Sequence, residues 1–280
     1  MLCIPAMVLT ASRNGVRGGY RQMPSCRRSP TIGAHGILMI GRLALALAAM
    51  VLCGRPARGA ELFYMDHDVF TGRYIGPVGP LVLSGDIAPG DYDRLLAKIS
   101  EDPDRFLTHN KVIMASTAGD SDEAVRIATL LQSMYSEVDV GPLTGRCSGA
   151  CFLIYAAAAQ RSVDGERLLG IDVPVPGAVR AFLDENGVPA DLLDDSAQRT
   201  PQEVHWLTEK DLARLGGRSP AFQHYLAGKC AWNDELERAA NADRKSFDDL
   251  KSMWTCRIGV TRAAARKALA AAIKGSGPRR

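Results

Sequence analysis

Residues 145–155 read Gly145-Arg146-Cys147-Ser148-Gly149-Ala150-Cys151-Phe152-Leu153-Ile154-Tyr155, which places a turn of small residues between two cysteines, directly before an apolar helical run. This layout is typical of a nucleophile elbow, a sharp turn that holds a reactive side chain at the N-terminus of a helix. The free N–H groups and the dipole of such a terminus favour developing negative charge. The stretch therefore indicates the remains, or the working form, of an acyl-transfer site.

Outward from this turn, short strands alternate with helices. The apolar pattern predicts strands at residues 80–85, 111–115, 138–140 and 167–171. It predicts helices at residues 92–99, 122–135 and 150–160, the last of them apolar nearly all round and therefore buried. Strands separated by helices, with short turns between them, indicate an α/β fold with a mostly parallel sheet and helices packed against it.

Composition limits the class of protein. A chain of 280 residues with 46% hydrophobic content is long enough to bury the core of one large or two small domains. The formal charge is +3, but residues 1–60 hold eight arginines and no lysine or acidic residue, which leaves 26 basic against 31 acidic residues in the remainder. The net charge of that remainder is near −5, and it has no basic patch of the kind that binds nucleic acid. No nucleic-acid partner is therefore expected.

The N-terminal residues 1–60 are interpreted as a leader with a signal peptide at about 39–60. Arg42 precedes the apolar run 43–52, which is too short to span a bilayer comfortably, and small residues follow it. We expect cleavage after Gly59 or Ala60, with Met39 as the biological start or an unusually long leader. The mature protein would then be periplasmic or secreted, with no membrane contact beyond the signal peptide. An uncleaved anchor is the alternative.

Four cysteines lie beyond the leader, and an even number in an exported chain is suited to disulfides. Three pairings are possible. We favour Cys147 with Cys151 across the elbow and Cys230 with Cys256, which would tie down a small helical C-terminal extension at 217–260. A zinc site is the alternative, but neither pair has the usual two-residue gap and no histidine cluster stands nearby, so no metal is expected.

The last segment, residues 261–280, intersperses alanine with basic residues. This pattern predicts a weak, frayed basic helical tail with a solvated face rather than a membrane-binding helix. No nucleotide-phosphate loop, dinucleotide fingerprint or paired metal motif is present in the sequence, so no cofactor is expected.

Between Leu81 and Gly216 the chain resembles the ClpP/crotonase-like superfamily, in particular the exported bacterial ClpP-like proteins. Three local patterns, in order and at matching spacing, carry the resemblance. They are residues 116–120 with the helix start 123–128, similar to the family's Ser-Pro-Gly-Gly turn; residues 147–151, similar to its Cys-x-Ser-x-Cys elbow; and residues 155–161 with 169–171, similar to the helix and strand before its histidine. The resemblance implies a ClpP/crotonase-like domain at residues 61–216.

Three departures from the family pattern fall on one site. The position of the nucleophilic serine in active relatives is Gly149 here, and a serine stands one place earlier at Ser148. The position of the general-base histidine is Asp172, and the glycine pair whose backbone N–H resembles an oxyanion-hole donor is Ala118-Gly119. A serine hydroxyl needs a neighbouring base to take its proton, and an ordinary carboxylate is too weak a base.

We therefore expect a catalytically degenerate relative that binds a peptide or protein in the old cleft, and whether the chain is an enzyme stays open with the balance toward no. The first alternative is an active serine peptidase or hydrolase that uses Ser148, with Asp172 or His205 as its base. A working cysteine nucleophile at the elbow would be abolished by disulfide pairing. The last alternative is a structural protein that forms homo-oligomers, as the resemblance implies.

Overall fold

A computed structural model describes residues 59–66, 79–141, 145–172, 175–198, 200, 203–233, 235, 237 and 247–276. They belong to one compact unit, Pro56–Arg280. The predicted leader lies outside the described residues except for Gly59 and Ala60, so the signal peptide stays a prediction. Within the described ranges, none of the helices combines the length and the apolar character that crossing a bilayer requires.

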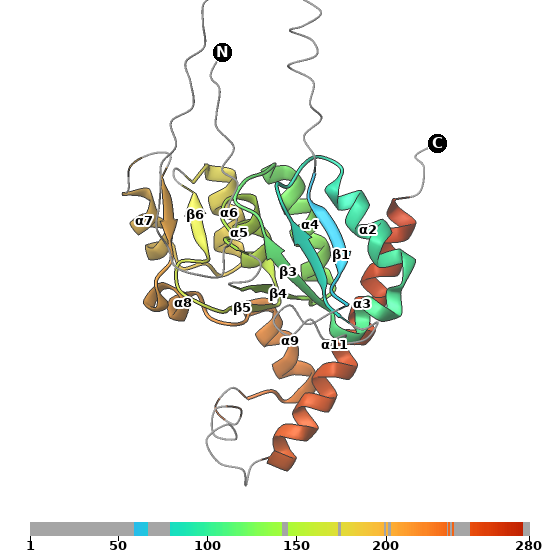
Figure 1. Cartoon of the computed structure of the whole chain (residues 1–280). Coiled ribbons are helices and arrows are strands. Elements are labelled where there is room, and N and C mark those ends of the chain that lie inside the picture. The colour runs from blue at the N-terminus through green and yellow to red at the C-terminus, as the bar shows by residue number, and fades with distance from the viewer. Residues whose placement is uncertain are drawn as a thin grey trace, which may run out of the picture. The chain divides into compact units, whose positions relative to one another are not determined.

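The centre of the fold is a five-stranded sheet with the order β1-β2-β3-β4-β5. β1 pairs with β2 in the antiparallel sense, and the other neighbours are parallel, with register pairs such as Leu83 with Met114 and Val112 with Val138. This arrangement confirms the α/β fold with a mostly parallel sheet (Figure 1). The strands are β1 (Glu61–Tyr64), β2 (Leu81–Ser84), β3 (Lys111–Ala115), β4 (Glu137–Val140) and β5 (Gln160–Val163).

The fifth strand corrects the predicted helix at 150–160. That helix, α5 (Ala150–Ala157), ends three residues earlier because Ala158 takes an extended conformation. The amides of Ala159 and Gln160 then bond to the Ser136 carbonyl as the chain enters the sheet. A run of buried alanines has the same apolar pattern inside a helix and in the segment that leads into a buried strand. Hydrophobic periodicity therefore could not locate the end of the helix.

Helices α2 (Asp91–Glu101), α3 (Pro103–His109) and α4 (Ser121–Ser133) follow the first strands, and α4 packs against α5. The N-terminus of α2 has no side-chain cap of its own at Gly90. Glu123 of α4 supplies one, because its Oε1 accepts from the Gly90 amide at 3.0 Å and the Tyr92 amide at 2.7 Å. A buried carboxylate at this helix N-terminus satisfies otherwise unpaired donors and therefore joins the two helices.

Arg161 of β5 is buried and joins three helix ends. Its guanidinium donates to the carbonyls of Ala156 in α5, Asn186 at the end of α6 (Gly177–Glu185), and Leu215 at the end of α8 (Glu209–Leu215). Burial lowers the pKa of this guanidinium to about 10. Carbonyls at helix C-termini carry partial negative charge, so the three ends together stabilise one cation.

A second, two-stranded sheet lies beside the main one. β6 (Gly170–Asp172) pairs with β7 (Val204–Trp206) in the antiparallel sense, so Asp172 faces Val204 and Ile171 faces His205. The predicted strand at 167–171 is therefore shifted to 170–172. α7 (Ala190–Ala197) lies between these strands in the sequence and beside them in space (Figure 1).

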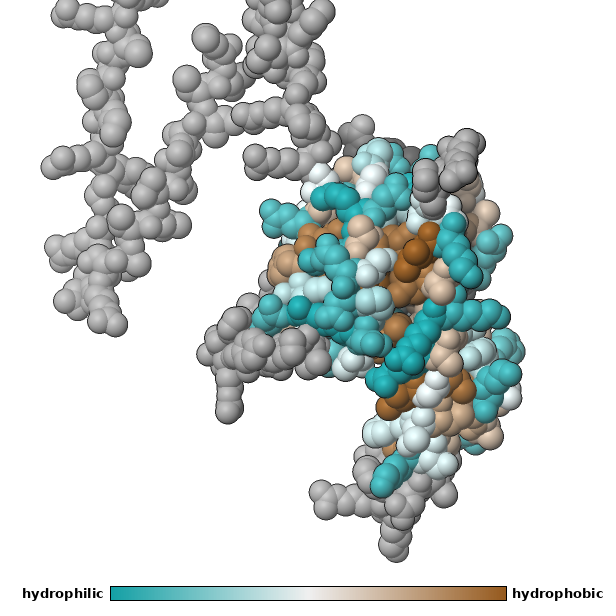
Figure 2. Space-filling model, turned by 90° about the vertical axis from the view of Figure 1, so that its right-hand side faces the viewer, coloured by the Kyte–Doolittle hydropathy of each residue, from teal (hydrophilic) through white to brown (hydrophobic). Residues whose placement is uncertain are grey.

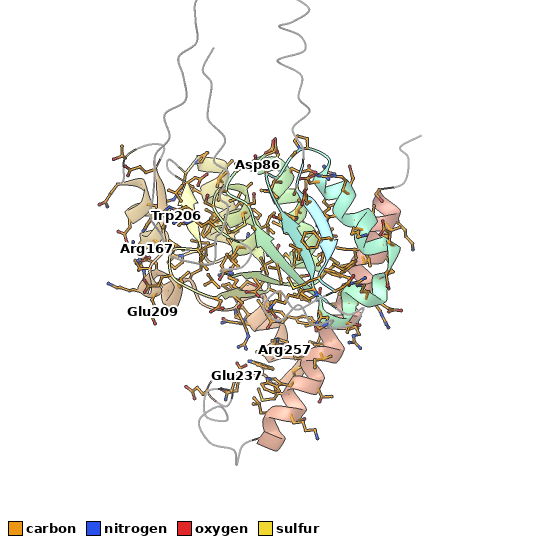
Figure 3. All side chains as sticks on the ribbon, in the orientation of Figure 1. Asp86, Arg167, Trp206, Glu209, Glu237 and Arg257 are labelled. Carbon is orange, nitrogen blue, oxygen red and sulfur yellow. A yellow bond between two sulfur atoms is a disulfide. The ribbon has the colours of Figure 1, made fainter. Side chains whose placement is uncertain are left out.

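The C-terminal part consists of α9 (Pro220–Cys230) and a long helix, α11 (Phe247–Gly275), which the Cys230–Cys256 disulfide joins. Arg218 binds Glu237 through two contacts of 2.7 Å, and both Arg218 and Arg257 lie over the Trp232 ring. Figure 3 shows Glu237 and Arg257 in this part of the molecule.

The structure corrects the frayed tail predicted at 261–280 as far as the described residues reach, which is to residue 276. α11 continues without a break through residue 261 to Gly275, so the expected boundary at 260 falls inside one helix. Ala265 and Leu269 are buried in the main core, against which α11 packs by contacts with α2, α3 and α4. On the face that Figure 2 turns toward the viewer, hydrophobic residues lie between hydrophilic ones. Alanine side chains are small enough for the helix to pack closely against the core. Because alanine is only weakly apolar, the sequence pattern did not indicate this burial.

Candidate functional site

The elbow is held by backbone hydrogen bonds on both sides. Cys147 forms parallel bridges with Ser116, after β3, and with Leu169, before β6. The Cys147 amide donates to the Leu168 carbonyl at 2.7 Å, and the Ser148 amide donates to the Ser116 carbonyl at 3.0 Å. The Cys147–Cys151 disulfide then ties the turn to the first turn of α5, with 5.3 Å between the two Cα atoms. The backbone of the elbow is therefore fixed beside the carboxyl end of β3, where open α/β sheets bind ligands.

Gly149 occupies the sharp position of this turn. Its φ of 57° and ψ of −122° lie in a region that side chains other than glycine rarely adopt. A Cβ atom added there would lie 2.5 Å from Oδ2 of Asp172, closer than real Cβ contacts allow. The carboxylate of Asp172 thus fills the space into which a nucleophilic side chain at position 149 would project.

Asp172, at the end of β6, is solvent-exposed and also contacts the elbow directly. Burial raises the pKa of its carboxyl group, while hydrogen bonds from the Ser148 side chain and the Gly149 amide act in the opposite direction and favour the charged form. The Gly149 amide lies at the N-terminus of α5, where an anion is favoured. The chain therefore places its own carboxylate against the amide that precedes α5.

Ser148 is fully buried, and its single hydroxyl hydrogen has two acceptors in reach, the Thr117 carbonyl at 3.3 Å and the Asp172 carboxylate. No histidine of the described residues is among the partners shown for this hydroxyl. The geometry places Ser148 beneath the elbow rather than in the pocket described below.

The turn after β3 contributes Ala118 and Gly119. Gly119 has a φ of 146°, and a Cβ atom there would lie 2.6 Å from the Ile87 carbonyl oxygen, so glycine is required. The Ala118 carbonyl accepts from the Ile87 amide at 3.2 Å and from the Ser116 hydroxyl at 2.9 Å. Gly119 lines the pocket described below. Ala118 does not line it, and its carbonyl is used in hydrogen bonds within the loop.

A pocket of about 220 Å³ opens at the elbow. Three of the predicted site residues, Gly119, Gly149 and Asp172, line it together. Its remaining walls are mostly apolar and come from α5, β6, α6 and the segment before α6, namely Ala150, Phe152, Leu153, Ile171, Val175, Pro176, Val179 and Leu183, with Ser121 as a polar member. The structure thus offers an apolar pocket with one carboxylate at its edge.

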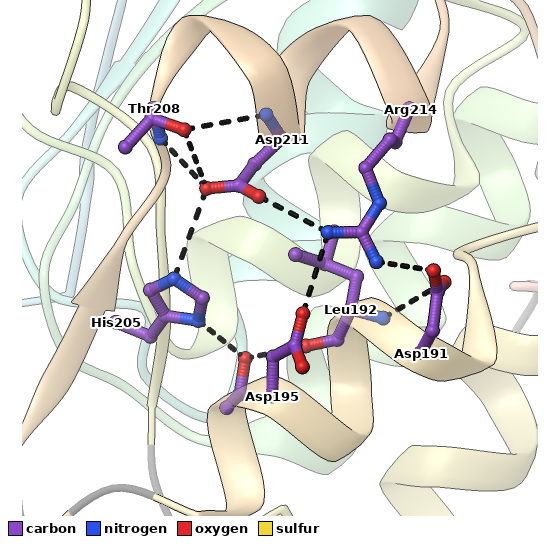
Figure 4. A network of polar contacts seen from close by, with 8 residues as sticks. Asp191, Leu192, Asp195, His205, Thr208, Asp211 and Arg214 are labelled. Carbon is purple, nitrogen blue, oxygen red and sulfur yellow. Dashed lines mark hydrogen bonds and ion pairs between the residues drawn. The ribbon is translucent and has the colours of Figure 1, made fainter.

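The histidine weighed as a possible base, His205, is occupied elsewhere. Its side chain is buried on β7, with Nδ1 at 2.7 Å from the Ser196 hydroxyl and Nε2 at 3.8 Å from Oδ2 of Asp211 (Figure 4). Burial alone would raise the pKa of Asp211, but hydrogen bonds from Thr208 and the charges of His205 and Arg214 lower it. These contacts join β7, α7 and α8.

Sequence reasoning missed this Ser196–His205–Asp211 contact. A part of it was readable, because Thr208 and Asp211 form a capping box at the start of α8. Ser196 is fully buried and also donates to the Leu192 carbonyl at 2.8 Å. A hydroxyl without access to substrate cannot act as a nucleophile, so the contact is structural. Among the described residues, no group of histidine, cysteine and acidic side chains is suited to hold a metal ion.

Comparison with known proteins gives structural neighbours only: no family model and no curated protein matches the sequence. ClpP1 from Listeria monocytogenes is 15% identical and has a TM-score of 0.34, covering 49% of this chain and 86% of its own. A protein assigned as an enoyl-CoA hydratase/isomerase from Bordetella parapertussis is 16% identical and has a TM-score of 0.31, covering 79% of this chain and 99% of its own. Both belong to the superfamily that the sequence motifs resemble.

The elbow geometry predicts that Gly149→Ala lowers the free energy of unfolding by about 2–4 kcal/mol, because it combines a strained backbone with contact against Asp172. Gly145→Ala is the matched control, since Gly145 also has a positive φ, of 97°, but a Cβ there meets nothing within 4 Å. Urea unfolding would measure both. In an Asp172→Gly background the cost of Gly149→Ala should fall to that of Gly145→Ala, and an unchanged cost would contradict the contact.

Proposed function

We propose that the chain is an exported, non-catalytic protein with a ClpP-like domain, which binds a peptide or protein partner in the elbow pocket. One observation carries the proposal: glycine stands at the sharp position of the elbow, and the carboxylate of Asp172 occupies the space of the missing side chain. An acyl-transfer reaction needs a nucleophile at this point and an unoccupied donor group for the developing oxyanion. Gly149 offers no nucleophile at this point, and Asp172 already accepts from the Gly149 amide.

The pocket itself supports a binding role. Its backbone is rigid, since hydrogen bonds to both flanking strands and a disulfide hold the elbow. Its walls are mostly apolar, and Ser121 and Asp172 are the polar side chains among the described lining residues. Pre-formed, mostly apolar pockets with few polar groups are typical of ligand sites.

The alternative of a serine hydrolase acting through Ser148 would need three changes in geometry. The hydroxyl would have to leave Thr117, reach the pocket, and obtain a base stronger than the carboxylate of Asp172. His205 is the histidine weighed for that role, and its bond to Ser196 holds it in the network of α7 and α8.

We expect that a fluorophosphonate probe leaves the purified protein unlabelled, because no activated serine faces the pocket. The double variant Gly149→Ser with Asp172→His serves as a positive control, since it returns a hydroxyl and an imidazole to the two positions. Intact-mass spectrometry reads the adduct. Labelling of the unmodified chain that disappears in Ser148→Ala would establish the hydrolase instead.

Binding in the pocket predicts retention of peptides from a random octapeptide pool on the immobilised protein. Val179→Trp should abolish retention, because it fills the pocket from α6. Glu185→Trp adds the same side chain at an exposed position of that helix and should have no effect. Mass spectrometry of the eluted peptides measures the result, and equal retention by the two variants would place binding outside the pocket.

Export is supported by the two disulfides, which persist in oxidising compartments. The structure also favours one of the two expected cleavage points. Ala60 is fully buried, and its amide donates to Oδ2 of Asp91 at 2.9 Å, while Asp91 itself is 1% exposed. Cleavage after Gly59 would convert this amide into an ammonium group that pairs with the buried carboxylate, whereas cleavage after Ala60 would remove the contact.

We therefore expect the mature protein to begin at Ala60. Small residues at Ala57 and Gly59 also fit the recognition pattern of signal peptidases. Intact-mass measurement without reductant, on protein recovered after export, should give a chain that starts at Ala60 and holds all four remaining cysteines as disulfides. Retention of residues 39–59, or a start at Glu61, would contradict this.

A further inference from the structure

The elbow pocket has a distinctive electrostatic property, a single carboxylate among mostly apolar walls. Among its lining residues in the described part of the chain, Asp172 is the one ionisable side chain. The influences on its pKa are burial, the Ser148 hydroxyl and the Gly149 amide, and no arginine or lysine is among them. None of the ion pairs found between described residues includes Asp172. The carboxylate therefore borders the pocket without a counter-ion from the described chain.

The α5 N-terminus offsets only part of this charge. A helix N-terminus is equivalent to about half a positive charge, against a full negative charge on the carboxylate. The site where a ligand oxyanion, carboxylate or phosphate would bind is already occupied by Asp172, so a second anion would meet like charge. The remaining field in the pocket is negative and attracts a cation.

The shape of the pocket restricts the cation further. Phe152, Ile171, Val179 and Leu183 give it apolar walls, and its volume of about 220 Å³ suits a body of a few carbon atoms. A compact ammonium group can donate to the solvent-exposed carboxylate, while its carbon chain lies against these walls. A hydrated metal ion would gain nothing from them.

Building on the proposed binding function, we infer that the elbow pocket takes a primary ammonium group carried on a short apolar body, with the nitrogen at Asp172 and the carbons along α5 and α6. A free peptide amino terminus beginning with an aliphatic residue and a lysine side chain both present this chemistry.

Three probes of nearly equal shape test the inference on the intact mature chain: 3-methylbutylammonium, 3-methylbutan-1-ol and 3-methylbutanoate. Titrations followed by amide NMR signals of Gly119 and Gly149 give the dissociation constants. We expect the ammonium probe to bind at least fivefold more tightly than the alcohol, and the carboxylate to bind most weakly. Equal affinities, tightest binding of the carboxylate, or no binding of any probe would overturn the inference.

Variants assign the effect to one residue. Asp172→Asn keeps the shape and a hydrogen-bond acceptor, so it should reduce the ammonium affinity to that of the alcohol. Asp164→Asn, an exposed carboxylate outside the lining, should leave the ratio unchanged. If Asp172→Asn fails to fold, the relative affinities of the three probes for the unmodified chain still test the inference.

A comparison of three peptides distinguishes the source of the ammonium group and separates this inference from the proposed function. An aliphatic peptide with a free amino terminus, an Nα-acetylated peptide that contains lysine, and one acetylated at both positions are compared. Preference for the first or the second identifies the source. Equal binding of all three overturns the ammonium inference but retains peptide binding, whereas binding of none overturns both.

Discussion

The contact between the Asp172 carboxylate and the Gly149 backbone is the constraint on which the site depends. It requires glycine at the sharp point of the elbow, because a Cβ there would lie 2.5 Å from Oδ2. It also places a negative group at the N-terminus of α5, where the dipole favours one. The two residues are therefore coupled, because the Asp172 carboxylate leaves room for glycine but not for a larger residue at position 149.

Much of the fold could be predicted because its signals are local. The alternation of strands and helices indicated a mostly parallel sheet, and the small residues between Cys147 and Cys151 marked the elbow. The disulfides in the structure join the pairs that the sequence favoured. The same local signals failed at α11, where alanines that look like a solvated face pack closely against the core. They also failed before β5, where the alanine run continues past the end of α5 into the turn that leads to the strand.

The candidate site was only partly accessible in this way. Their positions in the motif identified Gly149, Asp172 and Gly119 as site residues. The motif could not predict that the Asp172 side chain fills the space at Gly149, because this depends on how β6 lies beside the elbow. Nor could spacing reveal that His205 is bound to Ser196, nine residues earlier and on another element. The pseudoenzyme interpretation and the oligomeric state stay predictions. The Asp172–Gly149 and His205–Ser196 contacts join distant segments, so residue types alone could not predict them.

Arg161 has a consequence for how the molecule comes apart. Its buried guanidinium is held by carbonyls at the ends of α5, α6 and α8. Detaching any one of these helices would leave a cation in the interior with fewer partners, which is costly. Local opening of a single helix is thereby discouraged, and the three should exchange their slowest amide protons together, as one cooperative unit. The pocket borders two of these helices, α5 and α6, so Arg161 also helps to maintain its shape.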